Sequence, residues 1–145
     1  MSNEANLPLS EKWRYRPYDQ ANFVLQPGGS RDFVDLRKHG WALWAGVTMS
    51  NPNLSCTVKL ETGTEEYSNT FTCTNLMAAN LVAPTPSGWW VSRFDVINNV
   101  YCVMFTPSQW WPFYRRINIV LTNNTVTPIT VFRASLLAIE FIDSV

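Results

Sequence analysis

The sequence predicts an all-β protein, a single antiparallel β-sandwich of the jelly-roll type with an extended N-terminal arm. Three observations lead to this fold class: apolar and polar residues alternate from about residue 22 onward, helical periodicity is nearly absent, and turn signals separate the alternating segments. The chain of 145 residues fits one domain. It has room for roughly eight or nine strands, which favours a jelly roll over the alternative, an immunoglobulin-like sandwich.

The first 21 residues differ from the rest of the chain. They contain two prolines, mixed charge and little alternation, and their only large rings are Trp13, Tyr15 and Tyr18. Such a segment cannot form a core of its own. We therefore divide the chain into an extended N-terminal arm, residues 1–21, and a sandwich domain, residues 22–145. We expect the arm to lie on a neighbouring subunit, and packing along its own domain is the alternative.

Alternation within the domain defines the strands. Segment 54–61 places its apolar side chains on one face and its polar ones on the other, as in a half-buried strand. In segment 40–49 the same spacing predicts that Trp41, Leu43 and Ala45 share a face. Glu140, between two apolar neighbours, is expected to point outward. Further strands are expected at 22–26, 31–36, 89–97, 100–106, 113–121, 128–133 and 135–142, with a short helical turn at 76–82.

Segments 54–61 and 67–75 are expected to form a hairpin around Gly63. A symmetric register pairs Val58 with Phe71 and Cys56 with Cys73, so the two thiols come within reach of a bridge. Because the chain has an odd number of cysteines and no apolar leader at its start, we expect reduced thiols.

Catalytic motifs are missing from the sequence. The single histidine, His39, has no Ser or Cys motif beside it, and no metal-ligand cluster, phosphate loop or nucleophile elbow occurs. Asp95 is the most notable acid, and a pair with Arg93 or Arg115 explains it more simply than catalysis does. We therefore expect neither enzyme activity nor a cofactor or metal.

Charge and hydropathy exclude other classes of function. The formal net charge is zero, which argues against direct nucleic-acid binding. No apolar run approaches the roughly 18 residues of a membrane span, and no signal peptide is expected. Charged residues make up only 15% of the chain, against about 25% in average proteins, which suits a surface buried in an assembly.

Aromatic residues give the clearest functional signal. Four of the seven tryptophans form the adjacent pairs Trp89-Trp90 and Trp110-Trp111, and neighbours in a strand point to opposite faces. One ring of each pair can enter the core, while the other must be covered by a subunit or a ligand. Anchors of a subunit interface, stacking platforms for sugars and plugs of the sandwich end are the three interpretations. The candidate interface or ligand-stacking residues are Trp13, Tyr15, Tyr18, Trp89, Trp90, Trp110, Trp111 and Tyr114.

The chain resembles small jelly-roll structural proteins of virus particles: capsid, cement or decoration proteins of phages and other viruses. The arm, the alternating strands LSCTVKLE and YSNTFTCT, and the terminal strand RASLLAIEFIDSV carry this resemblance. It is a likeness of the whole chain rather than of a motif, so no functional residue is carried over. The resemblance implies a symmetric homo-oligomer, often a trimer, fixed to other virion proteins by arms and edges.

Our hypothesis from the sequence is therefore a non-enzymatic structural protein of a virus particle that docks through its arm and its aromatic surface. Its location would be the virion, assembled in the host cytoplasm. A carbohydrate-binding or host-attachment module, with a glycan as its partner, is the alternative.

Overall fold

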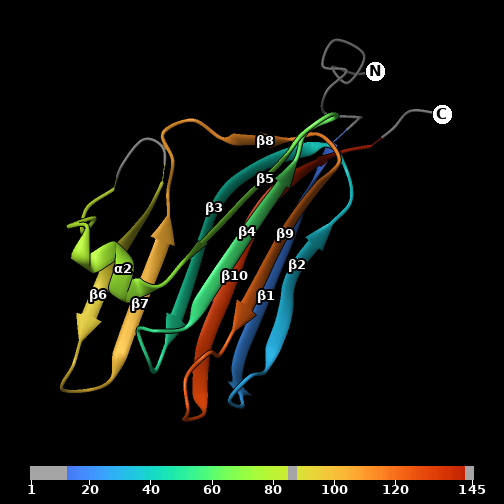
Figure 1. Ribbon diagram of the computed structural model, residues 1–145. Helices are drawn as coiled ribbons and strands as arrows, with labels where there is room; N and C mark the ends of the chain where they lie inside the picture. The colour runs from blue at the N-terminus through green and yellow to red at the C-terminus, as the bar shows by residue number, and fades with distance from the viewer. Residues whose placement is uncertain (1–12, 85–87, 143–145) are drawn as a thin grey trace.

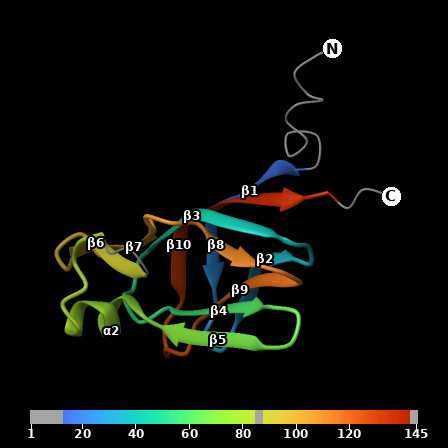
Figure 2. The ribbon, with the colours of Figure 1, turned by 90° about the horizontal axis from the view of Figure 1, so that it is seen from above.

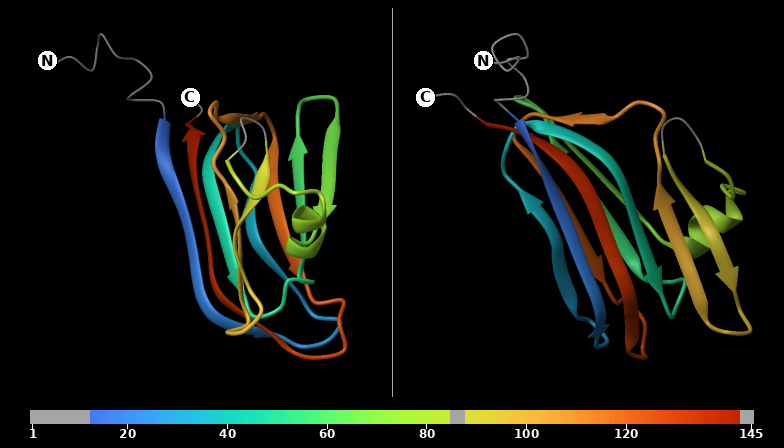
Figure 3. Two further views of the ribbon diagram at one scale, coloured as in Figure 1. Left: turned by 90° about the vertical axis from the view of Figure 1, so that its left-hand side faces the viewer. Right: turned by 180° about the vertical axis from the view of Figure 1, so that it is seen from behind.

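The computed structural model describes residues 13–84 and 88–142, which form two antiparallel sheets that pack face to face (Figure 1). The larger sheet has the strand order β1-β10-β3-β7-β6, with β8 also paired to β3, and the smaller sheet has the order β2-β9-β4-β5. The two layers are separated clearly in Figure 3. The all-β fold expected from the alternation is thus confirmed. The elements are β1 (Trp13–Leu25), β2 (Ser30–Leu36), β3 (Gly40–Met49), β4 (Ser55–Glu61), β5 (Glu66–Phe71), α2 (Cys73–Ala78), β6 (Trp89–Asp95), β7 (Val100–Phe105), β8 (Trp111–Phe113), β9 (Arg116–Thr122) and β10 (Ile129–Phe141).

The core lies between the two sheets and is built from the alternate residues of nearly every strand. Fully buried side chains include Val47 of β3, Val103 of β7, Leu121 of β9 and Leu136 of β10. Seen from above, β6, β7 and the short helix α2 lie at one side of the sandwich, and β1 and β2 lie at the other (Figure 2). The core therefore continues beneath the β6–β7 hairpin, where Trp89 and Phe105 belong to it.

Residues 13–21, which the sequence assigned to the arm, form part of β1. This strand pairs with β10 from Trp13 opposite Phe141 to Leu25 opposite Ile129. The first and last strands of the described chain are therefore neighbours in the larger sheet. The rest of the arm, residues 1–12, lies outside the described residues, as do residues 143–145 of the expected domain.

Glu140 corrects a second expectation, since its side chain points inward. It is only 1% exposed and accepts hydrogen bonds from Arg14 Nε at 2.9 Å and Arg16 Nη1 at 2.5 Å. On β10 the residues Leu136, Ala138 and Glu140 face the space between the sheets. A carboxylate is tolerated there because β1 supplies two guanidinium groups to compensate its charge.

The β4–β5 hairpin is confirmed, but with another register. Cys56 lies opposite Phe71, and Glu61 lies opposite Glu66, so the strands slide by two residues relative to the predicted pairing. A slip of two leaves every side chain on its expected face, which is why the alternation could not detect it. Cys73 does not face Cys56 in the sheet but begins α2, and all three cysteines are free thiols.

An irregularity in β3 overturns the predicted face of segment 40–49. Trp44 pairs with Leu137 of β10 and Ala42 pairs with Ala138, the next residue of β10. Leu43, between them, therefore has no partner on β10. This β-bulge inverts the alternation, so that Trp41 and Trp44 both point away from the core. A Cβ on Gly40, at the start of this strand, would clash with the carbonyl oxygen of Ile139, so only glycine fits there.

Two further strand boundaries differ from the prediction. β10 runs unbroken past a register shift next to Phe132, where two strands, 128–133 and 135–142, were expected. The expected strand 113–121 is divided into β8, which ends at Phe113, and β9, which starts at Arg116. The division lets β8 join the larger sheet while β9 joins the smaller one.

Candidate binding surfaces

The outer face of the larger sheet carries a row of aromatic side chains. Directly opposite residues of paired strands share a face, so Trp13 lies beside Phe141, and Tyr15 lies in one row with Ile139 and Trp41. This side is opposite to the core, because the alternate residues Ala42, Leu136 and Ala138 are the buried ones. We define the outer aromatic face as Trp13, Tyr15, Trp41, Trp44, Trp110, Tyr114 and Phe141.

Ring contacts form a continuous chain through Trp110, Trp41, Phe141, His39 and Tyr114, and Trp13 packs separately against Tyr15. Trp41 lies with its ring centroid 5.5 Å from that of Trp110 and 5.4 Å from that of Phe141. The His39 imidazole continues the chain, since it is 4.9 Å from both Phe141 and Tyr114 and nearly parallel to the tyrosine. Such contacts between rings hold the side chains in defined positions. The rings that make these contacts therefore have fixed relative positions.

Much of this apolar surface is left open to solvent. Tyr15 is 56% exposed, Tyr114 52%, Trp110 48% and Trp44 40%. Further along the same face, Arg133 and Ser135 hydrogen-bond the carboxylate of Asp19. A large exposed apolar area with a polar rim is typical of an interaction site.

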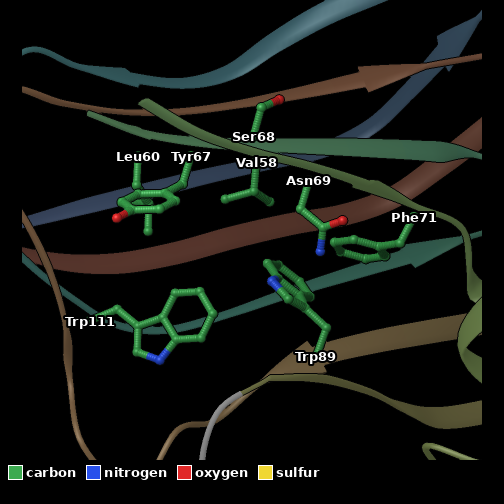
Figure 4. Close-up of a pocket in the computed structure, with 8 residues that line it drawn as sticks. All are labelled: Val58, Leu60, Tyr67, Ser68, Asn69, Phe71, Trp89 and Trp111. Carbon is green, nitrogen blue, oxygen red and sulfur yellow. The ribbon is translucent and has the colours of Figure 1, made fainter. Parts of the chain in front are cut away.

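A pocket of about 400 Å³ lies at the open side of the sandwich, between β5 and the larger sheet (Figure 4). Trp89 of β6 and Trp111 of β8 form one wall, and the opposite wall comes from β4 and β5. The rings are held from behind, because Phe105 packs against Trp89 at 5.4 Å and against Trp111 at 4.7 Å. The lining residues are Val58, Leu60, Tyr67, Ser68, Asn69, Phe71, Trp89 and Trp111.

The lining of this pocket is apolar and carries no ionisable side chain except Tyr67. The Tyr67 hydroxyl donates a hydrogen bond to Glu65, which raises the pKa of the phenol above its usual value. The Asn69 amide points into the pocket between Val58 and Phe71 in Figure 4. The pocket can therefore take a neutral, flat apolar group, with a phenol and an amide at its rim.

Six of the eight predicted aromatic residues lie on these two surfaces. Trp13, Tyr15, Trp110 and Tyr114 belong to the outer aromatic face, whereas Trp89 and Trp111 line the pocket. Trp90 lies on the opposite side of β6 from Trp89 and donates a hydrogen bond from Nε1 to Thr106. Tyr18 faces the inner side of β1 and packs against the core, where burial raises its pKa. The two indoles of each adjacent pair thus have different environments.

Sequence reasoning missed three members of the outer aromatic face: Trp41, Trp44 and Phe141. Trp41 was predicted to share a face with Leu43 and Ala45, and Trp44 was not singled out. Two residues three apart cannot share a face of a regular strand, and the bulge at Leu43 is what brings them together. The three-residue spacing of the two tryptophans, Trp41 and Trp44, was the one available signal.

The candidates for acid–base chemistry have structural explanations. His39 stacks between aromatic rings, as described above. Asp95 accepts hydrogen bonds from Asn98 N and Nδ2 and from Arg93 at 3.1 Å. The bonds from Asn98, with Arg93 beside them, lower the pKa of Asp95 to about 2, so the carboxylate stays ionised and closes the β6–β7 turn. The expected pairing with Arg93 is confirmed.

Within residues 13–84 and 88–142, no three His, Cys, Asp or Glu side chains are placed to hold a metal ion. Over the same residues, no helix has the length and apolar character to cross a membrane. Comparison with protein-family models gives no match, and no curated protein sequence matches the chain significantly. The function has to be inferred from the surfaces themselves.

Proposed function

We propose that the protein is a non-enzymatic structural subunit of a virus particle, which binds further copies of itself and other virion subunits through the outer aromatic face. The observation that carries this proposal is the exposed row of rings on the larger sheet. Burying such an apolar face against a partner is favourable, and exposed faces of this kind commonly mark interaction sites. A second copy presents the same surface, and isologous burial of identical patches is the commonest mode of self-association.

The pairing of the strands supports a jelly roll, the architecture of many capsid subunits and also of lectins. With the β6–β7 hairpin set aside as an insertion, the pairs are nested. The first strand pairs with the last (β1 with β10), the second with the second-last (β2 with β9), the third with the third-last (β3 with β8), and β4 with β5. A long antiparallel hairpin folded over on itself gives this order.

The arm remains in the proposal for residues 1–12 alone, which precede β1 and reach a neighbouring subunit. Deleting residues 1–21 would also remove most of β1 from its pairing with β10, so that experiment would test folding rather than assembly. Deleting residues 1–12 leaves every described strand intact and is the suitable variant.

Charge substitutions on the outer aromatic face test the proposal. Tyr15→Glu and Trp44→Glu each place a carboxylate in the middle of the proposed contact, where it would be desolvated without a partner. We expect each variant to weaken self-association by about tenfold or more, measured by sedimentation over a range of concentrations. Ile97→Glu, at a loop position that is 91% exposed, is the matched control.

Each variant is also followed by thermal unfolding, so that loss of assembly is separated from loss of fold. Equal particle masses for the parent, the two face variants and the control would contradict the proposal.

A carbohydrate-binding module is the second candidate, and one observation favours it. Beside Trp110 a shallow hollow of about 500 Å³ is lined by two indoles together with Ser108, Gln109 and Pro112. Exposed rings next to an amide and a hydroxyl can stack on a sugar and hydrogen-bond its hydroxyl groups. Glycan-array binding that Trp110→Ala abolishes and Trp90→Ala leaves unchanged would favour this candidate over assembly. A fully negative array would count against it.

A further inference from the structure

Edge strands expose unpaired backbone groups. Within the described residues, three of the four strands that end the two strand orders are protected. In β1, Pro17 interrupts the row of donors, and arginines point inward from the same strand. In β2 the register shifts between Asp32 and Val34. In β6 a second shift follows Val91, whose N–H already bonds the carbonyl of Leu81 in the segment after α2. Bulges, prolines and covering segments all prevent the addition of another strand.

The fourth edge, β5, has none of these protections within the described part of the chain. Its six pairs with β4, from Glu66 to Phe71, follow one unbroken register. The strand contains no proline, and residues 67–71 (YSNTF) carry no charge at neutral pH. Residues 66–70 are all exposed. This edge is therefore open to β-strand addition.

The pocket described above opens at this same edge. Tyr67 and Asn69 of β5 lie on its inner side, across from Trp89 and Trp111 (Figure 4). A strand added beside β5 would extend the smaller sheet, and its inward side chains would meet this apolar space. Backbone pairing and an apolar pocket for alternate side chains together form the usual recognition site for an extended segment.

We propose that the segment added at β5 is the β5 strand of a second copy, related by a two-fold axis. Antiparallel pairing of identical strands satisfies both edges at once and closes the contact, as a two-fold interface requires. The two smaller sheets then form one continuous sheet. This inference deepens the proposed function, on whose self-association it rests, by naming a second contact surface between copies.

The faces restrict the register of this pairing. Inward residues must lie opposite inward residues, so an odd-numbered residue of β5 meets an odd-numbered residue of the other copy. Placing Asn69 opposite Asn69 of the partner subunit sets Tyr67 opposite Phe71 of the partner subunit. That register joins two amides at the axis and an aromatic pair on each side, and it keeps the two Glu66 carboxylates apart.

A pair of charge variants tests the contact. Asn69→Glu sets two carboxylates directly opposite each other at the two-fold axis, and we expect the dissociation constant of the dimer to rise at least about tenfold. Ile97→Glu, at the exposed loop position used above, carries the same charge away from β5 and should associate like the parent. Equal masses for both variants and the parent would overturn the inference.

Cross-linking gives a second readout on the folded full-length chain. Asn69→Cys places two thiols opposite each other at the axis, and mild oxidation should produce a covalent dimer. Thr64→Cys, exposed in the β4–β5 turn, is the control and should remain largely monomeric. No covalent dimer from Asn69→Cys, or an equal yield from both variants, would contradict the register and assign the edge to another occupant, such as residues 1–12 or a foreign peptide.

The two proposals fail in different experiments. If Trp44→Glu disrupts self-association and Asn69→Glu does not, the outer aromatic face stands as a contact and the β5 inference falls. If the reverse holds, the β5 contact stands and the outer aromatic face is not the surface between copies.

Discussion

The ion cluster that joins β1 to β10 gives the sharpest prediction about stability. The Glu140 carboxylate is buried, whereas the side chain of Arg14 is 59% exposed and that of Arg16 is 35% exposed. Removing the charge from the acid and removing it from the two bases are therefore not equivalent. In the first case the exposed guanidinium groups turn to water, and in the second a buried carboxylate loses its compensation.

The expected magnitudes follow from this asymmetry. Glu140→Gln keeps the shape of the side chain and should cost about 1–2 kcal/mol, since the two hydrogen bonds join groups that solvent partly screens. Arg14→Met together with Arg16→Met keeps the aliphatic stems but leaves the carboxylate alone, which should cost about 3–5 kcal/mol.

Equilibrium unfolding in urea measures both free energies with one denaturant slope. The exposed pair Asp19–Arg133 is the control, and Asp19→Asn should change the free energy of unfolding by less than about 1 kcal/mol. If Glu140→Gln destabilised the protein as much as the double arginine variant, the burial asymmetry would not be the cause, and the reasoning would be refuted.

Three further predictions concern stability. Gly40→Ala should destabilise the protein by about 3 kcal/mol or more in urea unfolding, because the added Cβ would clash with the backbone of Ile139. Gly46→Ala should cost less than about 1 kcal/mol, since the closest neighbour of its Cβ is the flexible Met104 side chain, and equal losses would contradict this. Asn123 is fully buried and its amide makes four hydrogen bonds, so Asn123→Ala should cost about 2–4 kcal/mol, and a melting temperature equal to the parent's would be the contrary result. Burial raises the pKa of Cys56 to about 12, so between about pH 9 and 12 the folded state keeps a thiol proton that the unfolded state has lost. The free energy of unfolding should therefore fall as the pH rises through this range, and Cys56→Ala should show a smaller fall.

Alternation along the chain was sufficient to predict the all-β class and most strands, because a half-buried strand must place apolar residues every second position. The hairpin of β4 and β5 was predicted with correct faces and a register two residues away from the observed one. The turn that decides between these registers differs from the predicted one by a single residue at each end. Alternation carries no information about such a slip.

The candidate surface was only partly predictable, because it depends on bulges. Leu43 inverts the faces of β3 and brings Trp41 and Trp44 together on the outer aromatic face. Glu140 can be buried because two arginines compensate its charge. These partners lie more than a hundred residues away in the sequence. A distant ion pair leaves no local pattern in the sequence, and the extra residue in β3 leaves only the spacing of Trp41 and Trp44.

The native mass of the full-length chain in solution, measured by sedimentation over a wide range of concentrations, tests the central claim most directly. The proposed function predicts a particle of two or more chains at high concentration, which dissociates on dilution and whose mass falls in Trp44→Glu. A chain that stays monomeric at every concentration, with its outer aromatic face intact, would contradict self-assembly through that face.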